Sequence, residues 1–522
     1  MISGASENVA ELSGNSDPMK DGGKEGLRDT LKRYAPLWPL IMGLTFSRTG
    51  LIVASYGSYT STDEGIFTDG AMLVALTILS VLFIGATRGS RPLRKRTVNR
   101  IMRVCIALEA FSLIGLAVLD LFYIESFAWR FGLCVLCTLT ASGAICYWLR
   151  RARGTSTATA AVFVFSALII SEFIIYACTL IPVWAGSLIT GALVLFQYPC
   201  QIWARSRTQP HRIKAPNQES DYFGFSRTMI QNKRFLAATA IGVGCLSVVI
   251  GLLRGYPDGM PVAFEPLTRI AYGLLTVAFS VGIILLVLRG HQRIMTVGIF
   301  MAMEFLACWA LVCYAAFPDM LDIGAVFTTT LNALMVGFTW YVIIAFMSFG
   351  WRDPYYYAIA GWLVWLGCRG SARIALLEFY RFTTDTTLIS ILMGGMIVLS
   401  TQIIFAQFLD IAQKSHDEEK DEPQQKEGRL IKIMGLDETE NLASMRKMTM
   451  QHSAEELGRQ FLLSEREVEV LTLYALGYTQ KRVAEELFIT PGTAHTHIKR
   501  IYAKTGLHSR QEILDYLHTY TS

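Results

Sequence analysis

Charged side chains are scarce in this chain of 522 residues: they make up 17% of it, whereas hydrophobic residues make up 52%. Soluble domains average about 25% charged residues, so much of this chain is expected to lie in a solvent other than water. The shortage is local, because apolar runs of about 20 residues, each able to cross a hydrocarbon core of about 30 Å, recur from position 34 to position 410. No such run occurs beyond position 410.

Residue patterns that catalysis requires are also missing. The sequence has no glycine-rich nucleotide-binding loop, no histidine spacing typical of a metal site, and no alternation of strands and helices typical of a receiver domain. Cys134 and Cys137 form a CxxC pair, but this pair lies inside an apolar run without a second pair nearby, which favours packing over zinc binding or redox chemistry. We therefore predict a protein that is not an enzyme and has no metal or cofactor.

The apolar runs predict twelve membrane-spanning helices in two sets of six. They are expected near residues 36–56, 69–87, 101–123, 127–148, 158–178, 183–203, 235–253, 267–288, 294–316, 325–348, 357–377 and 387–409. This layout resembles the major facilitator superfamily, which implies an all-helical membrane domain over residues 34–410. That family carries a Gly–Asp–Arg signature between its second and third spans. The corresponding segment here reads GATRGSRPLRKR and lacks the aspartate, which argues against active transport.

Lysine and arginine gather in the even-numbered connections between these spans. The basic residues include Arg88, Arg91, Arg94, Lys95, Arg96 and Arg100 in the second connection, Arg150, Arg151 and Arg153 in the fourth, and Arg289 and Arg293 in the eighth. The odd-numbered connections are nearly free of them. The positive-inside rule then places the even connections and both chain termini in the cytoplasm of a bacterial cell, with the protein in the inner membrane.

Several predicted spans carry ionisable side chains well inside the apolar run. Each is costly in a bilayer unless it is paired or faces a wet cavity, so each is a candidate functional residue. Arg369 and Arg373 share one helix face in a span that Gly367 and Gly370 interrupt, an arrangement that favours an anionic ligand. The alternative is internal pairing with the buried glutamates, which would fix helix packing. The candidate ligand-binding residues are Arg48, Glu109, Glu172, Glu304, Arg369 and Arg373.

The polar parts of the chain complete the division into domains. Residues 1–33 are rich in glycine, serine and charge, and we expect a flexible cytosolic tail. Six acidic residues and three lysines fall between Lys414 and Glu427, which is typical of a solvated linker, and we assign the linker to residues 411–460. Residues 461–522 then form a separate C-terminal domain.

Four short helices are predicted in this C-terminal domain. The expected N-cap residues are Ser464, Thr479, Thr490 and Ser509. The first and fourth helices have a glutamate three positions later, which completes a capping box. The third has Pro491 at its first position, where a missing N–H costs nothing, and it ends at Gly506. Two short helices joined by a tight turn within such a unit indicate a helix-turn-helix, whose third helix would enter the major groove of DNA.

The predicted third helix has two distinct faces. Its apolar seam comprises Ala494, Ile498, Ile501 and Tyr502. Its opposite face comprises Thr493, His495, Thr496, Lys499, Arg500 and Lys504, with three permanent cations and no acid. The alternative to a DNA-contacting surface is an ordinary solvated helix face.

The domain resembles the LuxR-type helix-turn-helix family. The resemblance is carried by Leu463, Arg466, Glu467, Glu469, Val470, Leu471, Ala475, Gly477, Thr479, Lys481, Val483, Ala484, Leu487, Ile489, Thr490, Thr493, His497, Ile501, Lys504, Gly506 and Arg510. It implies that residues 495, 496 and 499 face base edges. It also implies that Thr479, Lys481, Thr493, His497 and Lys504 make phosphate or helix contacts, and that the chain dimerises through the last helix on inverted half-sites of promoter DNA.

Four positions depart from the usual form of the family: Ala494 stands for valine, His495 for lysine, Arg500 for asparagine and Thr505 for leucine. His495 is at a position that the resemblance places at base edges, so we expect altered sequence specificity. The overall architecture narrows the resemblance further. Many-span membrane proteins that end in such a domain resemble regulators of Eggerthella-group actinobacteria, and the segment IYAKTGLHSRQEILD matches their usual form closely.

Three functions remain open on this basis. The first is a membrane sensor of a small-molecule effector that controls transcription. The second is a transporter fused to a regulatory DNA-binding domain, and the third is a constitutive membrane anchor for a DNA-binding protein.

Overall fold

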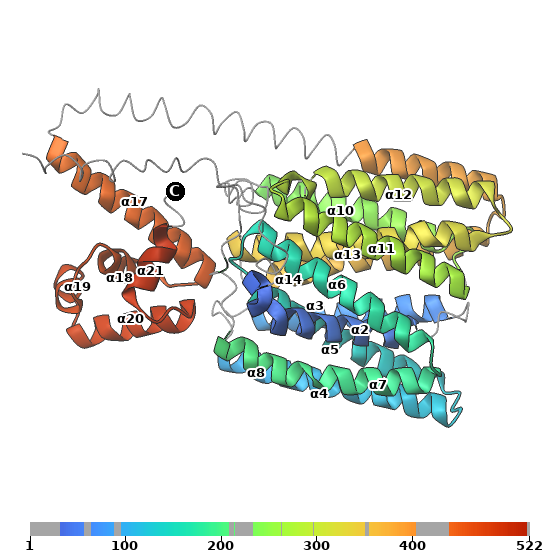
Figure 1. Ribbon diagram of the computed structural model, residues 1–522, viewed down its shortest axis with the longest axis horizontal. Coiled ribbons are helices and arrows are strands. Elements are labelled where there is room, and N and C mark those ends of the chain that lie inside the picture. The colour runs from blue at the N-terminus through green and yellow to red at the C-terminus, as the bar shows by residue number, and fades with distance from the viewer. Residues whose placement is uncertain are drawn as a thin grey trace, which may run out of the picture.

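The computed structural model describes residues 32–56, 64–87, 95–207, 233–260, 264–295, 297–349, 354–402 and 438–518, together with residues 213 and 262. Every regular element in these residues is a helix. Figure 1 shows a large bundle of roughly parallel helices and, at one end of it, a small C-terminal unit. The predicted N-terminal tail, apart from its last two residues, and most of the charged linker lie outside the described residues.

Each of the twelve predicted spans coincides with a described helix or pair of helices. The first six correspond to α2 (Trp38–Tyr56), α3 (Glu64–Thr87), α4 (Lys95–Leu121), α5 (Phe127–Arg151), α6 (Thr157–Thr179) and α7 with α8 (Val183–Leu195 and Gln197–Arg207). The next four are α10 (Lys233–Arg254), α11 (Pro266–Leu288), α12 (Val297–Ala316) and α13 (Leu321–Phe349). The last two are the interrupted run α14–η5–α15 (Pro354–Tyr380) and a helix over Thr386–Gln402.

Eight of the described helices are long and apolar enough to cross a membrane. Three further apolar helices, Asp69–Leu82, Thr239–Arg254 and Thr386–Gln402, are shorter. Large apolar side chains are exposed along the outer helices, for example Phe111 and Phe305, which are 60% and 57% exposed. Such an apolar exterior is costly in water and is expected for a protein whose outer surface faces lipid.

α13 lies at the centre of the bundle, where 94% of its most apolar stretch is buried. It packs against α10, α11 and α12 in the second half of the bundle and against α6 in the first half. α6 also packs on α11, and α15 packs on α3. The two halves therefore share one continuous core, which runs from Tyr34 to Ile397.

The C-terminal unit has its own hydrophobic core, formed by α17 (Glu438–Phe461), α18 (Glu465–Ala475), α19 (Gln480–Glu486), α20 (Pro491–Thr505) and α21 (Arg510–His518). The second half of α17 contributes Met450, Ala454 and Leu457 to this core. The region predicted as a linker, 411–460, thus ends in a helix that packs with the domain after it. We therefore propose that the C-terminal unit begins within α17 and not at residue 461.

Candidate nucleic-acid interface and buried charge clusters

Arg48 and Glu172, two of the predicted ligand-binding residues, pair with each other. The Nη2 of Arg48 on α2 lies 2.5 Å from Oε1 of Glu172 on α6, and its Nη1 donates to the hydroxyl of Ser171 at 2.5 Å. Both charged side chains are less than a tenth exposed. This contact matches the internal pairing that the sequence left open, and it joins α2 to α6.

Glu109 and Glu304 lie in two other places. Glu109 on α4 is fully buried and accepts a hydrogen bond from Nε2 of Gln197 at 3.3 Å, and Gln197 in turn accepts from the indole of Trp148 at 2.9 Å. Glu304 on α12 accepts from the hydroxyl of Ser400 at 2.9 Å. The six predicted ligand-binding residues therefore do not form one site.

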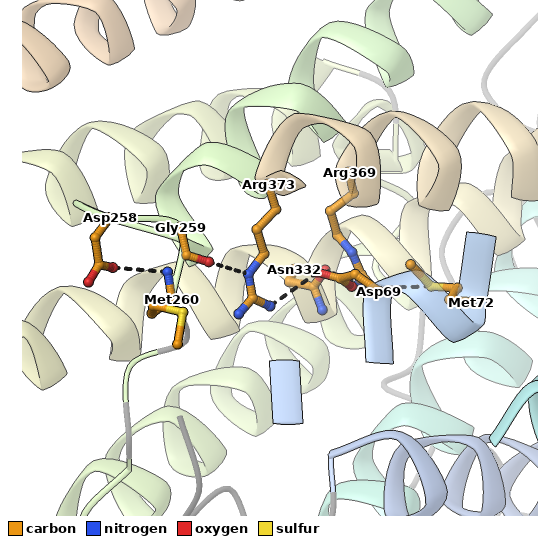
Figure 2. Close-up of polar contacts among 8 residues, drawn as sticks. All are labelled: Asp69, Met72, Asp258, Gly259, Met260, Asn332, Arg369 and Arg373. Atoms are coloured by element: carbon orange, nitrogen blue, oxygen red, sulfur yellow. Dashed lines mark hydrogen bonds and ion pairs between the residues drawn. The ribbon is translucent and has the colours of Figure 1, made fainter. Parts of the chain in front are cut away.

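Arg369 and Arg373 both converge on Asp69 of α3 (Figure 2). Arg373 Nη1 lies 3.1 Å from one carboxylate oxygen of Asp69, and Arg369 Nη2 lies 3.5 Å from the other. Arg369 also donates to Oδ1 of Asn332 on α13 at 3.1 Å. Each of the three charged residues is at most 4% exposed. This cluster holds two guanidinium groups around one carboxylate.

Sequence reasoning missed Asp69 and Asn332 as members of this cluster. Asp69 stands at the first position of the predicted span 69–87, and Asn332 lies inside the predicted span 325–348. The signal that could have identified Asp69 was an acidic residue at the edge of an apolar run. The pairing itself joins residues 304 positions apart, so it depends on how the two halves of the bundle meet.

The backbone around the cluster is irregular. Leu363–Gly367 form a π-helical turn between α14 and α15, in the span that the glycines were predicted to interrupt. π-Turns within α-helices are frequent at functional sites because they change the direction in which nearby groups project. Arg373 Nε also donates to the carbonyl of Gly259 at 3.2 Å. Gly259 has a φ of +85°, and a Cβ there would lie 2.5 Å from Cα of Leu377, so glycine permits this close approach.

The helix starts of the C-terminal unit agree with the predicted caps. Ser464 and Glu467 form a complete capping box, and the side chains of Thr479 and Thr490 accept from the backbone N–H three positions later. The Ser509 hydroxyl likewise accepts from the Glu512 N–H at 3.1 Å. The Glu512 carboxylate accepts from the backbone of His508 instead of the capping residue, so this last box is shifted by one position.

α20 presents the two faces that its sequence predicts. Ala494, Ile498 and Ile501 are at most 3% exposed and pack into the core. The opposite face is exposed and consists of Thr493, His495, Thr496, Lys499 and Arg500. α20 contains no acidic residue, so the exposed face is cationic. An exposed cationic helix with hydroxyl and imidazole groups has the donors that phosphates and base edges accept.

Lys504 is held against the domain itself. Its ammonium donates to the carbonyl of Leu462 at 2.9 Å and forms an ion pair with Glu467. Burial disfavours the charged carboxylate, but hydrogen bonds from Lys504 and Ser464 outweigh burial and lower the pKa of Glu467 below its ordinary value. Of the two roles that the resemblance implied for Lys504, phosphate contact or helix contact, the structure contains the second.

The remaining predicted contact residues lie on α19 and α20. Thr479 and Lys481 are exposed at the start of α19, and Thr493 is exposed in the first turn of α20. His497 is half-buried. Thr479 and Thr493 lie at the starts of α19 and α20, two helices that pack against each other.

The arrangement defines the class of this C-terminal unit. A short helix, a tight turn and an exposed cationic helix on a small helical core form a helix-turn-helix DNA-binding domain. Residues 462–517 match the model of the family described as bacterial regulatory proteins, luxR family. These residues are a LuxR-family helix-turn-helix domain, which belongs to a family of DNA-binding transcriptional regulators.

Curated relatives are similar over a short, domain-sized part of this chain. The oxygen regulatory protein NreC of Staphylococcus aureus strains JH9, USA300 and MSSA476 is 44% identical over 55 residues, which is 10% of this chain and 25% of the relative. The chain thus spans about a quarter of the length of these relatives. The likeness concerns the DNA-binding domain and not the helical bundle that precedes it.

Proposed function

We propose that this protein is a membrane-bound, one-component transcriptional regulator. Its helical bundle senses a small molecule within the membrane, and its C-terminal domain binds promoter DNA. The observation that carries the proposal is that one chain contains both parts. A LuxR-family domain with an exposed cationic recognition helix follows a bundle that has eight helices long and apolar enough to span a membrane. A ligand changes the output of such a protein only through a different affinity for its two states.

The proposed topology places both termini in the cytoplasm, with the protein in the bacterial inner membrane. Support comes from the basic residues of the even-numbered connections. A second line of support is that the C-terminal domain contacts the connection between α5 and α6, the fourth in the chain, through Phe461 and Arg153. A DNA-binding domain has to share a compartment with this connection, and only the cytoplasm contains the chromosome.

The proposed effector site is the cluster of Arg369, Arg373 and Asp69, and the proposed effector is an organic anion. Two guanidinium groups around one carboxylate, next to a π-helical turn, favour a bidentate anion such as a carboxylate. Arg48, Glu109, Glu172 and Glu304 are each engaged elsewhere, so we propose packing roles for them.

The proposed DNA complex is a dimer on inverted half-sites. His495, Thr496 and Lys499 face base edges, and Thr479, Lys481, Thr493, Arg500 and His497 make phosphate or helix contacts. Dimerisation uses α21, as the LuxR resemblance implies. All of these α19 and α20 side chains are exposed except His497, which is half-buried, and this exposure supports the assignment.

The test is a promoter reporter combined with chromatin immunoprecipitation in cells that carry the intact protein and receive a panel of small organic anions. We expect one class of anion to change reporter output and promoter occupancy together. The matched controls are Lys499→Ala, which should remove occupancy, and Arg373→Ala, which should leave basal occupancy but remove the response. Occupancy and reporter output that no compound alters would instead favour a constitutive anchor.

A transporter fused to a regulator is the second candidate, and the helices matching all twelve predicted spans are the observation in its favour. It predicts uptake of the effector into sealed vesicles that contain the protein. Binding without uptake favours the sensor.

A further inference from the structure

The DNA-binding domain contacts the bundle at the short connection between α5 and α6. The guanidinium carbon of Arg153 lies 5.0 Å from the ring centroid of Phe461, the last residue of α17. Burial lowers the pKa of Arg153 to about 10, so the side chain stays cationic at neutral pH. The contact is therefore a cation–π interaction between residues 308 positions apart, one from each part of the protein.

Gly154 brings the backbone of this connection directly against the same surface. Its φ is +75°, and a Cβ at this position would lie 2.4 Å from Nε2 of Gln460 and 3.0 Å from Oη of Tyr516. The Gly154 N–H donates to the Ser348 hydroxyl of α13 at 2.8 Å, which fixes the connection on the central helix of the bundle. The connection is thus held on one side by α13 and contacts the C-terminal unit on the other.

The receiving surface on the C-terminal unit joins α17 to α21. The Tyr516 hydroxyl donates to Oε1 of Gln460 at 3.0 Å, and the rings of Tyr516 and Phe461 meet edge to face at 5.7 Å. Tyr516 is a residue of α21, the helix through which the LuxR resemblance implies dimerisation. The α5–α6 connection therefore lies against the helix that the resemblance assigns to the dimer interface.

One side-chain contact and one interrupted helix link the α5–α6 connection to the cluster of Arg369, Arg373 and Asp69. Arg150, at the end of α5, donates to the hydroxyl of Tyr355 at 3.0 Å and lies over its ring at 4.8 Å. Tyr355 belongs to α14, which continues through the π-helical turn into α15 and its two arginines. A displacement of α15 can therefore reach the α5–α6 connection through a single interrupted helix.

We propose that the α5–α6 connection is a docking surface for the protein's own DNA-binding domain, and that docking there competes with dimerisation through α21. The docked form is a monomer that cannot bind inverted half-sites. Release of the domain frees Tyr516 and permits the DNA-bound dimer. The consequence for transcription rests on the proposed function, whereas docking and its competition with dimerisation do not.

The experiment measures dimer formation in the full-length protein in native membranes. A photoreactive benzoyl-phenylalanine replaces the exposed Asp515 on α21, and crosslinked dimers are separated by electrophoresis. Arg153→Ala and Gly154→Asn test the docking contact, since asparagine tolerates a positive φ but its added atoms displace Gln460. We expect the dimer-to-monomer ratio to rise by about 5- to 30-fold in each variant. This factor corresponds to the loss of one docking contact worth about 1–2 kcal/mol.

Two controls match these variants. Arg381→Ala removes an exposed arginine that pairs with Glu378. Gly506→Asn changes another glycine of positive φ, at which an added Cβ would meet nothing within 4 Å. Neither should change the dimer fraction. A dimer fraction that Arg153→Ala and Gly154→Asn leave at the wild-type level would overturn the proposal.

A second measurement detects docking itself. Benzoyl-phenylalanine in place of Phe461 should crosslink to the peptide that contains residues 150–156, and Gly154→Asn should reduce this product. Failure of the product to form in otherwise wild-type protein would also overturn the proposal. Both crosslinks need neither effector nor DNA. A protein that docks and dimerises as described but occupies no promoter would therefore contradict the proposed function and leave this inference standing.

Discussion

The exposed side chains of α20 divide into groups that can read bases and groups that can hold the backbone of DNA. His495 and Lys499 are one helical turn apart on the exposed face. A neutral imidazole offers one donor and one acceptor, whereas lysine offers donors alone. His495 at a position where lysine is usual therefore changes which base edge can be recognised.

Lys499→Ala should weaken binding to the operator by about 1–3 kcal/mol if Lys499 reads a base. The measurement is a titration of full-length protein, in detergent or nanodiscs, with operator DNA and with random DNA at several salt concentrations. An equal loss on both DNAs, with a shallower salt dependence, would assign Lys499 to a phosphate instead. Lys481→Ala is the matched comparison, because we propose a phosphate contact for it.

The ion pair of Lys504 with Glu467 should make the stability of the C-terminal unit depend on pH. The pKa of Glu467 is lowered in the folded state, so its contribution to stability is present above its ordinary pKa of about 4.5 and is lost as pH falls through the lower, folded value. Lys504→Met should cost about 1–3 kcal/mol at pH 7, because it leaves a buried carboxylate without its charged partner. The difference from wild type should shrink below pH 4.5.

Thermal unfolding of a fragment containing residues 438–522, recorded from pH 7 to pH 3, checks this expectation. Arg466→Met provides the control, because Arg466 pairs with Glu469 at the surface, where both side chains are about half exposed. Exposed pairs contribute little, so this variant should change the stability by less than about 1 kcal/mol. A pH-independent effect of Lys504→Met would contradict the ion-pair account.

At the scale of elements, the turn between α19 and α20 carries backbone strain. Phe488 has a φ of +54° and its side chain is 96% exposed. The left-handed conformation costs a residue with a Cβ roughly 1–2 kcal/mol, and no buried contact compensates an exposed side chain. Glycine avoids this cost but loses about 0.5–1 kcal/mol of backbone entropy on folding.

Phe488→Gly should therefore raise the stability of the C-terminal unit by up to about 1 kcal/mol, or a few °C in Tm for a domain of this size. Urea or thermal unfolding of the same fragment measures the change. A loss of stability would mean that the phenyl ring makes a contact in solution that offsets the strain.

Asp69 joins two helices of different halves, α3 and α15, and neutralises part of the charge on Arg369 and Arg373. Removing one partner of a buried charge cluster leaves the others uncompensated, which costs about 3–5 kcal/mol. Asp69→Asn should therefore lower the amount of folded protein in membranes and its thermal stability in detergent. Glu378→Gln, at an exposed pair on the same α15, should change stability by less than about 1 kcal/mol.

At the scale of the whole molecule, the separate core of the C-terminal unit predicts independent function. This core comprises buried residues from Met450 to Leu517. A soluble fragment of residues 438–522 should bind operator DNA, and it should dimerise more readily than the full-length protein because the α5–α6 connection is absent. Reporter output from the fragment should not respond to any effector. Sedimentation and operator titration test the first two expectations, and the anion panel tests the third.

Sequence patterns were sufficient for the helices and insufficient for their mutual contacts. Apolar runs located the helices of all twelve predicted spans, because the period and length of an apolar stretch are local properties. Capping residues located the starts of α18, α19 and α20 for the same reason. The role of α17 was missed, because its helical pattern is mixed with charge and its apolar residues become meaningful only beside the core of the next domain.

The sequence by itself determined the all-helical class, the apolar helices and a LuxR-family recognition helix with a cationic face, because each follows from side chains a few positions apart. Only the tertiary structure decided that Arg369 and Arg373 meet Asp69 and that Arg48 meets Glu172. It also decided that Arg153 and Gly154 face Phe461 and Tyr516. These contacts join residues more than 120 positions apart, and nothing local in the chain specifies which buried charge or ring will lie opposite another.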